Sequence, residues 1–163
     1  MASKLALLGG DPIRRRPFTR WPIFDERERS QLEDVLSSAN WGGFPSPNRK
    51  AAEFAEAFAR FEGARYVIPT SSGTTALEVA LKALEVGPGD EVIVPAITFA
   101  ATAYAPLTCN GRPVFADVDA NTMCIDPEAV RKLITRRTRA IIPVHYGASL
   151  ADLDALTAIA REH

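Results

Sequence analysis

Cysteine is scarce in this sequence of 163 residues, which contains only Cys109 and Cys124. The two show neither a disulfide framework nor the ligand spacing of a metal site, so we expect neither feature. No apolar run approaches the length of a transmembrane helix, and the N-terminus lacks a signal-peptide pattern. These absences argue against a membrane-spanning protein and favour a reducing cytoplasm.

An excess of charge of one sign is also missing. The net charge is −1, so we expect no nucleic-acid partner and no membrane partner. The arginine clusters at 14–16 and 136–139 are typical of solvated faces. Two nucleotide-binding signatures, G-x-x-x-x-G-K-[ST] and G-x-G-x-x-G after a strand, are absent as well. What remains is an ordinary globular composition, 47% apolar and 24% charged, in a chain long enough for one domain with a hydrophobic core.

The most informative segment of the chain joins an apolar run to a helical pattern through small hydroxyl residues. The run 67–69 is followed by Ser72, Gly73, Thr74 and Thr75. Apolar side chains then recur at helical spacing from Leu77 onward, which predicts a helix that begins near Thr74. A helix N-terminus has backbone N–H groups without partners and a partial positive charge, so it favours an anion.

This junction predicts a phosphate site. Gly73 lets the backbone approach a ligand closely, and Ser72, Thr74 and Thr75 offer hydroxyl groups. The alternative is that these hydroxyls only cap the helix, because most turns between a strand and a helix bind nothing. The segment by itself leaves both interpretations open.

The chain falls into two parts by pattern. Residues 1–63 form an arm without periodicity up to residue 25, a short helix after Asp25, a Gly/Pro-rich loop at 40–48 with Trp41 and Phe44, and a helix that ends at Gly63. Residues 64–163 alternate between short apolar runs and helical patterns. The expected strands are 66–68, 91–95, 113–116 and 140–144, and the expected helices are 74–84, 99–107, 127–134 and one after 150.

This alternation predicts an α/β fold, a three-layer αβα arrangement with a mostly parallel sheet. Ligands of such sheets gather beyond the carboxyl ends of the strands. Residues 72–75, Thr98-Phe99 and His145 all follow expected strand ends, so we expect them to converge on one crevice. By itself Phe99 would be read as a core residue.

Several motifs in order carry a resemblance to a known family. The first two are Thr-Ser-Ser-Gly-Thr-x-Ala-Leu at 70–77 and Gly-Pro-Gly-Asp-Glu-Val-Ile-Val-Pro-Ala at 87–96. They are followed by Thr98-Phe99, Val-Phe-Ala-Asp-Val-Asp at 114–119, Ile-Asp-Pro at 125–127 and Pro-Val-His-Tyr-Gly at 143–147. The series resembles the N-terminal part of the DegT/StrS sugar and aminocyclitol aminotransferases, which depend on pyridoxal 5'-phosphate (PLP) and share the fold of aspartate aminotransferase.

The resemblance implies a function and a site. It implies transamination of a keto-sugar or keto-cyclitol, with glutamate or glutamine as amino donor, by a homodimer. The arm and the Trp41 loop look closest to members that act on aminocyclitols or related antibiotic precursors. The resemblance places the PLP phosphate at Gly73 and Thr74 and the pyridine ring against Phe99. We expect Ser72 to be a cofactor-binding residue as well. We assign no chemistry to His145, which we read as a structural hydrogen-bond donor.

The sequence departs from the family pattern in two small ways and one large one. The family often has Asn where this chain has Cys124, and commonly has its glycine one position after Gly147. The chain ends at His163, before the positions of the aspartate that pairs with the pyridine nitrogen and of the Schiff-base lysine. We therefore expect the small C-terminal domain and all catalytic residues to be absent, and the chain to be an inactive fragment with an exposed sheet edge.

Two alternatives stay open from the sequence. The dehydratase branch of the same family replaces the Schiff-base lysine with histidine. A non-catalytic remnant that reuses the fold to bind a phosphate or to dimerise would need neither residue. We take transamination as the leading hypothesis.

Overall fold

The computed structural model describes residues 4–42 and 48–163 and divides into two compact units, residues 1–67 and 68–163. Phe44, which we expected in the loop at 40–48, lies outside the described residues.

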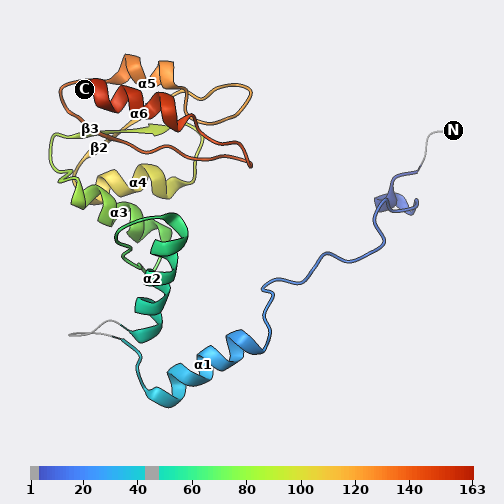
Figure 1. Cartoon of the computed structure of the whole chain (residues 1–163). Helices are drawn as coiled ribbons and strands as arrows, with labels where there is room; N and C mark the ends of the chain where they lie inside the picture. Colours follow the sequence, from blue (N-terminus) through green and yellow to red (C-terminus); the bar gives the residue numbers. More distant parts are fainter. Residues whose placement is uncertain (1–3, 43–47) are drawn as a thin grey trace. The chain divides into compact units, whose positions relative to one another are not determined.

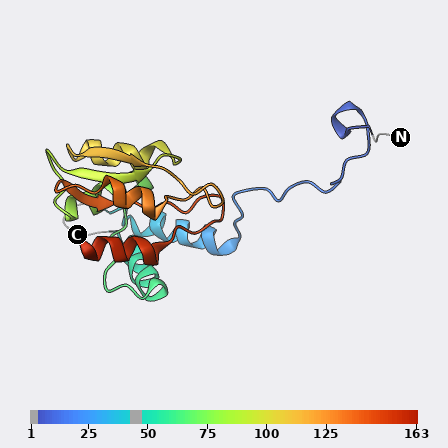
Figure 2. The same ribbon diagram turned by 90° about the horizontal axis from the view of Figure 1, so that it is seen from above.

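The first unit consists of short helices and extended chain. It contains the 3-10 turn η1 (Ala6–Leu8), α1 (Glu26–Ser38) and α2 (Arg49–Glu62). The chain between η1 and α1 has no helix or strand (Figure 2). Asp25 caps α1, because its carboxylate accepts from the Arg27 N–H at 2.8 Å. α2 ends at Gly63, whose φ of 66° lies in the left-handed region. Both expected helices are confirmed.

The second unit is a three-layer αβα arrangement, as the sequence predicts. Three parallel strands lie in the order β2-β1-β3, so β1 is central. Helices α3 and α4 cover one face of the sheet, and α5 and α6 cover the other (Figure 1). Its elements are α3 (Gly73–Ala83), β1 (Glu91–Pro95), α4 (Ala100–Thr108), β2 (Arg112–Ala116), α5 (Pro127–Leu133), β3 (Thr138–Ile141) and α6 (Leu153–Glu162).

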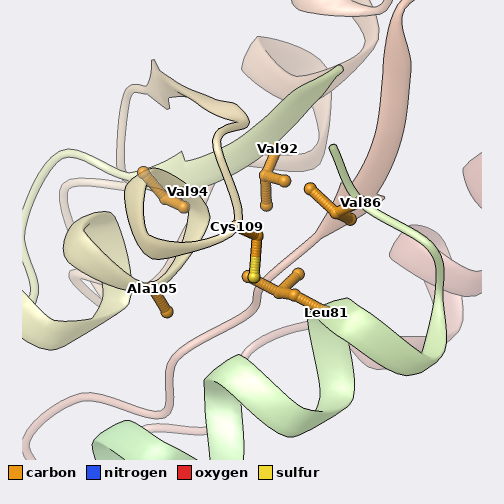
Figure 3. Close-up of a cluster of buried hydrophobic side chains, with 6 residues drawn as sticks. All are labelled: Leu81, Val86, Val92, Val94, Ala105 and Cys109. Carbon is orange, nitrogen blue, oxygen red and sulfur yellow. The ribbon is translucent and has the colours of Figure 1, made fainter. Parts of the chain in front are cut away.

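The core of this unit is divided by β1 into two clusters. Every residue of β1 is buried, because a central parallel strand is covered on both faces. Val92 and Val94 pack with residues of α3 and α4 (Figure 3), and Ile93 packs toward α5 and α6. The first cluster comprises Leu81, Val86, Val92, Val94, Ala105 and Cys109. The second comprises Ile93, Ala116, Ile125, Val130, Leu156 and Ile159.

Two strand predictions need correction. Residues 66–68 form no strand, so that prediction is wrong. An apolar run becomes a strand only when a neighbouring strand accepts its hydrogen bonds, and no strand in the described part of the chain pairs with this one. The expected strand 140–144 is displaced to Thr138–Ile141. Its pairing ends with the Ile142 N–H on the Ile93 carbonyl, since Pro143 has no N–H to continue it.

The outer edges of the sheet are open. Within residues 4–42 and 48–163, no strand pairs with the outer side of β2 or of β3. A groove of about 830 Å³ lies beside β3 and α6, lined in part by Ile134, Ile141 and Leu156. Open edges of this kind are sites where further β-structure can pair.

A buried carboxylate joins the three strands at the amino end of the sheet. The Glu91 side chain is only 2% exposed. It accepts hydrogen bonds from the Thr135 hydroxyl at 2.7 Å, from Arg137 Nε at 2.8 Å, and from Arg112. Arg112 belongs to β2, and the other two lie in the turn before β3. These hydrogen bonds, chiefly the one from Thr135 and then the one from Arg112, lower the pKa of Glu91 to about 2.

Glu91→Gln is expected to destabilise the second unit, because the amide loses the charge that the two arginines neutralise. The pKa of Glu91 is depressed in the folded state, so its contribution is fully present above the ordinary value of 4.5 and is lost as the pH falls toward about 2. The difference in unfolding free energy between wild type and variant should therefore shrink over that range. Urea unfolding followed by circular dichroism at several pH values measures it.

The matched control is Glu85→Gln, because the Glu85 side chain is 85% exposed and pairs with Arg139 only at 3.3 Å. This variant should unfold like the wild type at every pH. Equal stabilities of the Glu91 and Glu85 variants at neutral pH would contradict the structural role of Glu91.

Candidate functional site

The N-terminus of α3 is built by the hydroxyl residues that the sequence singles out. Ser72 is the N-cap, in an extended conformation, and its hydroxyl oxygen accepts from the Thr75 N–H at 3.2 Å. The Ser72 and Thr75 hydroxyls lie 3.0 Å apart. Thr70 donates to the Ser72 carbonyl at 3.0 Å, which ties the preceding turn to the cap. The helix therefore begins where it was expected, although no strand precedes it.

The next two residues leave their backbone donors free. Within the part of the chain that the structure describes, the N–H groups of Gly73 and Thr74 have no hydrogen-bond partner, and neither does the Thr74 hydroxyl. Gly73 is exposed, and a Cβ atom built on it would meet nothing within 4 Å. An anion can thus approach this turn without displacing any atom. Two free N–H groups, a free hydroxyl and the positive end of the helix dipole fit a phosphate group.

A pocket connects this turn with the first turn of α4. Its lining includes Thr74, Ala100 and Ala101, so the N-terminal turns of the two helices lie close together. Phe99, the N-cap of α4, directly precedes Ala100. Its side chain is 79% exposed, so the reading of Phe99 as a core residue is wrong. Phe99 itself does not line the pocket, but its exposed ring directly precedes α4 and is free to stack on a flat aromatic group.

Three apolar side chains of this pocket were not among the residues predicted from the sequence. Tyr104, Leu107 and Phe115 line it and are 58%, 52% and 56% exposed. Tyr104 and Leu107 follow Ala100 at spacings of four and seven, so they share one face of α4. Thr102 and Ala105 are buried and face the sheet. The helical spacing of these residues could have been used to distinguish the pocket face of α4 from its buried face.

His145 has a different hydrogen-bonding role from the one we expected. It follows the carboxyl end of β3 and is exposed, and it does not line the pocket that contains Thr74. Its Nδ1 accepts a hydrogen bond from the Ala151 N–H at 2.9 Å, so the ring acts as an acceptor and not as the expected donor. Convergence of His145 with residues 72–75 and 98–99 on one crevice stays a prediction.

Two further classes of feature can be stated for the described residues. No group of three metal-ligating side chains gathers anywhere in them. None of their helices is both long enough and apolar enough to span a bilayer.

Comparison with known families identifies the group to which the sequence is related. The model of the DegT/DnrJ/EryC1/StrS aminotransferase family matches residues 22–163. The chain belongs to this family. The resemblance drawn from the motifs is confirmed, and so is the assignment of the fold to PLP-dependent aminotransferases.

Relatives within the family include enzymes named for cyclitol substrates. A Streptoalloteichus tenebrarius protein, provisionally named an L-glutamine:3-amino-2,3-dideoxy-scyllo-inosose aminotransferase, is 50% identical over all of this chain and 39% of its own length. The L-glutamine:2-deoxy-scyllo-inosose aminotransferase of Streptomyces lividus is 45% identical with the same coverage. The chain thus spans about 39% of the length of these curated relatives.

Solved structures of the family superimpose well on the chain. 3-Amino-5-hydroxybenzoic acid synthase matches 90% of this chain and 38% of its own, with a TM-score of 0.85 and 40% identity. NtdA from Bacillus subtilis, solved with bound cofactor PMP, matches 91% of this chain and 35% of its own, with a TM-score of 0.78 and 33% identity.

The capping role of Ser72 leads to a stability prediction. Ser72→Ala should lower the free energy of unfolding by about 1 kcal/mol, because the Thr75 N–H loses its acceptor. The control is Ser71→Ala, since Ser71 is exposed and makes only a 3.5 Å contact with the Thr75 hydroxyl. Chemical denaturation of both variants measures the difference. Equal midpoints for Ser72→Ala and the wild type would show that the cap contributes nothing.

Proposed function

We propose that this chain provides the phosphate-binding and ring-stacking part of a PLP-dependent aminotransferase. The reaction is transfer of an amino group from glutamine or glutamate to a keto-cyclitol or keto-sugar. The observation that carries the proposal is the open N-terminus of α3, where Gly73 and Thr74 present free donors in a family of PLP-dependent enzymes.

Each predicted site residue has a separate task in this proposal. The N–H groups of Gly73 and Thr74 and the Thr74 hydroxyl bind the cofactor phosphate. Ser72 caps the helix and so keeps those donors pointing outward. Phe99 stacks on the pyridine ring, which an exposed side chain at the start of α4 is free to do. When bound, PLP supplies the electron sink for the amino-transfer chemistry.

The names of the relatives support the substrate class. Both sequence relatives above are named for L-glutamine as donor and for an inosose as acceptor, and their similarity covers all of this chain. An inosose is a ring polyol with one ketone, so the acceptor we propose is a keto-cyclitol. The conversion serves the synthesis of aminocyclitols of the kind found in antibiotics.

We also propose how the chain is arranged within such an enzyme. Residues 64–163 form part of the large PLP-binding domain, and residues 1–63 form an N-terminal arm and helices. The separate core of the second unit supports this division. The enzyme acts as a homodimer in the cytoplasm, which is the arrangement that the family resemblance and the composition favour.

We expect no lysine of the chain to bind the cofactor covalently, because none of the four lysines matches the position of the family's Schiff-base lysine. Lys82 lies in the last turn of α3, about 13 Å along the helix axis from Gly73. Lys50 pairs with Asp34 at 2.8 Å in the first unit. Lys132 lies in the last turn of α5, and Lys4 lies in the arm.

The 163-residue polypeptide is therefore expected to form no borohydride-trapped adduct at a single defined lysine. Mixing it with PLP, reducing with borohydride and mapping the peptides should give scattered, low labelling. Amino transfer from glutamine to 2-deoxy-scyllo-inosose should be undetectable with the polypeptide alone. One dominant labelled lysine together with turnover would show that a lysine of this chain has the catalytic role.

Thr74→Val tests the phosphate site directly. The probe is pyridoxine 5'-phosphate, which has the phosphate and the ring of the cofactor but no aldehyde to react with lysines. Wild-type chain should show weak, saturable shifts of the Gly73 and Thr74 amide resonances. The variant should bind at least about tenfold more weakly, because one hydrogen bond to a charged group is lost.

The control for this experiment is Thr108→Val, whose hydroxyl donates to the Ala105 carbonyl at the other end of α4. It should bind the probe like the wild type. Equal affinity of the Thr74 and Thr108 variants would remove Thr74 from the site, and an absence of any response at Gly73 in the wild type would reject the site itself.

A further inference from the structure

The imidazole of His145 has a defined proton arrangement. Its Nδ1 accepts the Ala151 N–H at 2.9 Å, and a nitrogen that accepts carries no proton. The neutral ring must therefore carry its proton on Nε2. Within the described residues nothing accepts a hydrogen bond from Nε2, and the side chain is exposed. The ring thus presents one free N–H donor to the solvent.

The loop that carries His145 is a tight hairpin. Tyr146 and Ser149 exchange two backbone hydrogen bonds, of 3.1 Å and 2.8 Å. Gly147 and Ala148 between them both have positive φ, 54° and 68°, as in the two-residue turns that suit a β-hairpin. The hairpin begins directly after His145, so the position of the hairpin determines where the imidazole lies.

A buried thiol attaches this hairpin to the loop that follows β2. Cys124 is 2% exposed, and its Sγ donates to the Ser149 carbonyl at 3.5 Å. Cys124 is itself held in place, because its carbonyl accepts the Asp119 N–H at 2.9 Å. The loops after β2 and β3 are therefore joined, although β1 separates their strands in the sheet. The contact fixes the His145 loop at the carboxyl end of the sheet.

We propose that His145 is a pre-oriented Nε2–H donor to a neutral oxygen of the acceptor substrate, and that Ala151 and Cys124 are its positioning residues. The carboxyl end of a parallel sheet is where its ligands bind. A neutral N–H on a fixed ring suits a ketone or hydroxyl oxygen, the groups that a keto-cyclitol carries in number. The identity of this ligand rests on the function proposed above, whereas the proton arrangement of His145 does not.

Nitrogen-15 NMR of the 163-residue chain tests the proton arrangement. The chain has only two histidines, so the terminal His163 serves as an internal reference for a free ring. At alkaline pH, long-range proton–nitrogen spectra should show an unprotonated Nδ1 and a protonated Nε2 at His145, more completely than at His163. An Nδ1–H ring at His145, or the same tautomer mixture at both histidines, would overturn the proposal.

Cysteine variants test the positioning role. Cys124→Ala should bring the tautomer mixture of His145 closer to that of His163 and speed amide exchange at Ser149 and Ala151 several-fold. Cys124→Ser keeps a donor for the Ser149 carbonyl, so its His145 tautomer and its amide exchange should match those of the wild type. This comparison remains informative if Cys124→Ala fails to fold. Cys109→Ala is the matched control, because this buried thiol donates to the Glu78 carbonyl at 3.9 Å and belongs to the core cluster formed with α3 and α4. Equal effects of Cys109→Ala and Cys124→Ala would show a general packing effect and reject the role of Cys124.

Ligand titration tests the donor role with 2-deoxy-scyllo-inosose as the probe. The wild type should show saturable shifts at His145 Nε2 and at the Tyr146 amide. His145→Asn retains an acceptor for the Ala151 N–H, but its amide nitrogen stands near the place of ring Cδ2 and does not reach the position of Nε2. Its Tyr146 amide should therefore not respond. No response in the wild type, or an unchanged response in the variant, would reject the donor role. The pyridoxine 5'-phosphate response at Gly73 tests the proposed function separately, so the two can fail independently.

Discussion

Burial of β1 on both faces is the constraint on which the rest of the second unit depends. Val92 and Val94 hold α3 and α4 against one side of the sheet, and Ile93 holds α5 and α6 against the other. Because α3 and α4 pack on the same side, their N-terminal turns can share a pocket beside Thr74. The open helix end and the exposed Phe99 are therefore positioned by core packing at a distance from them.

Parallel strands give the sheet two chemically different ends. At the amino end, Glu91 forms ion pairs with Arg112 and Arg137 and so joins the strands. These charges therefore stabilise the fold. At the carboxyl end, the loops after the strands carry Phe99 and His145, whose side chains are exposed. The buried charge of Glu91 thus lies at the end of the sheet where no ligand is expected. The exposed side chains lie at the carboxyl end, where parallel sheets bind their ligands.

Much of the local structure could be predicted because its causes are local. Asp25 and Ser72 cap their helices by contacts with residues two or three positions later, so the sequence contains both partners. The buried strand β1 was evident from its continuous apolar run between turn residues. The strand expected at 66–68 failed, because a strand also needs a partner that apolar residues alone do not specify. The same limit displaced β3, because its first residue pairs with Glu91 and its last with Ile93, and both partners lie on another strand.

Motif order, hydrophobic period and helix caps are properties of neighbouring residues, so the family, the layer arrangement and the hydroxyl turn at 72–75 could be predicted without coordinates. Tertiary packing was needed to show that Phe99 is exposed, that Glu91 is buried between two arginines, and that His145 accepts through Nδ1. It also brought Cys124 to Ser149, two positions 25 residues apart. These features depend on which strands lie side by side, and long-range packing sets that order rather than any local pattern.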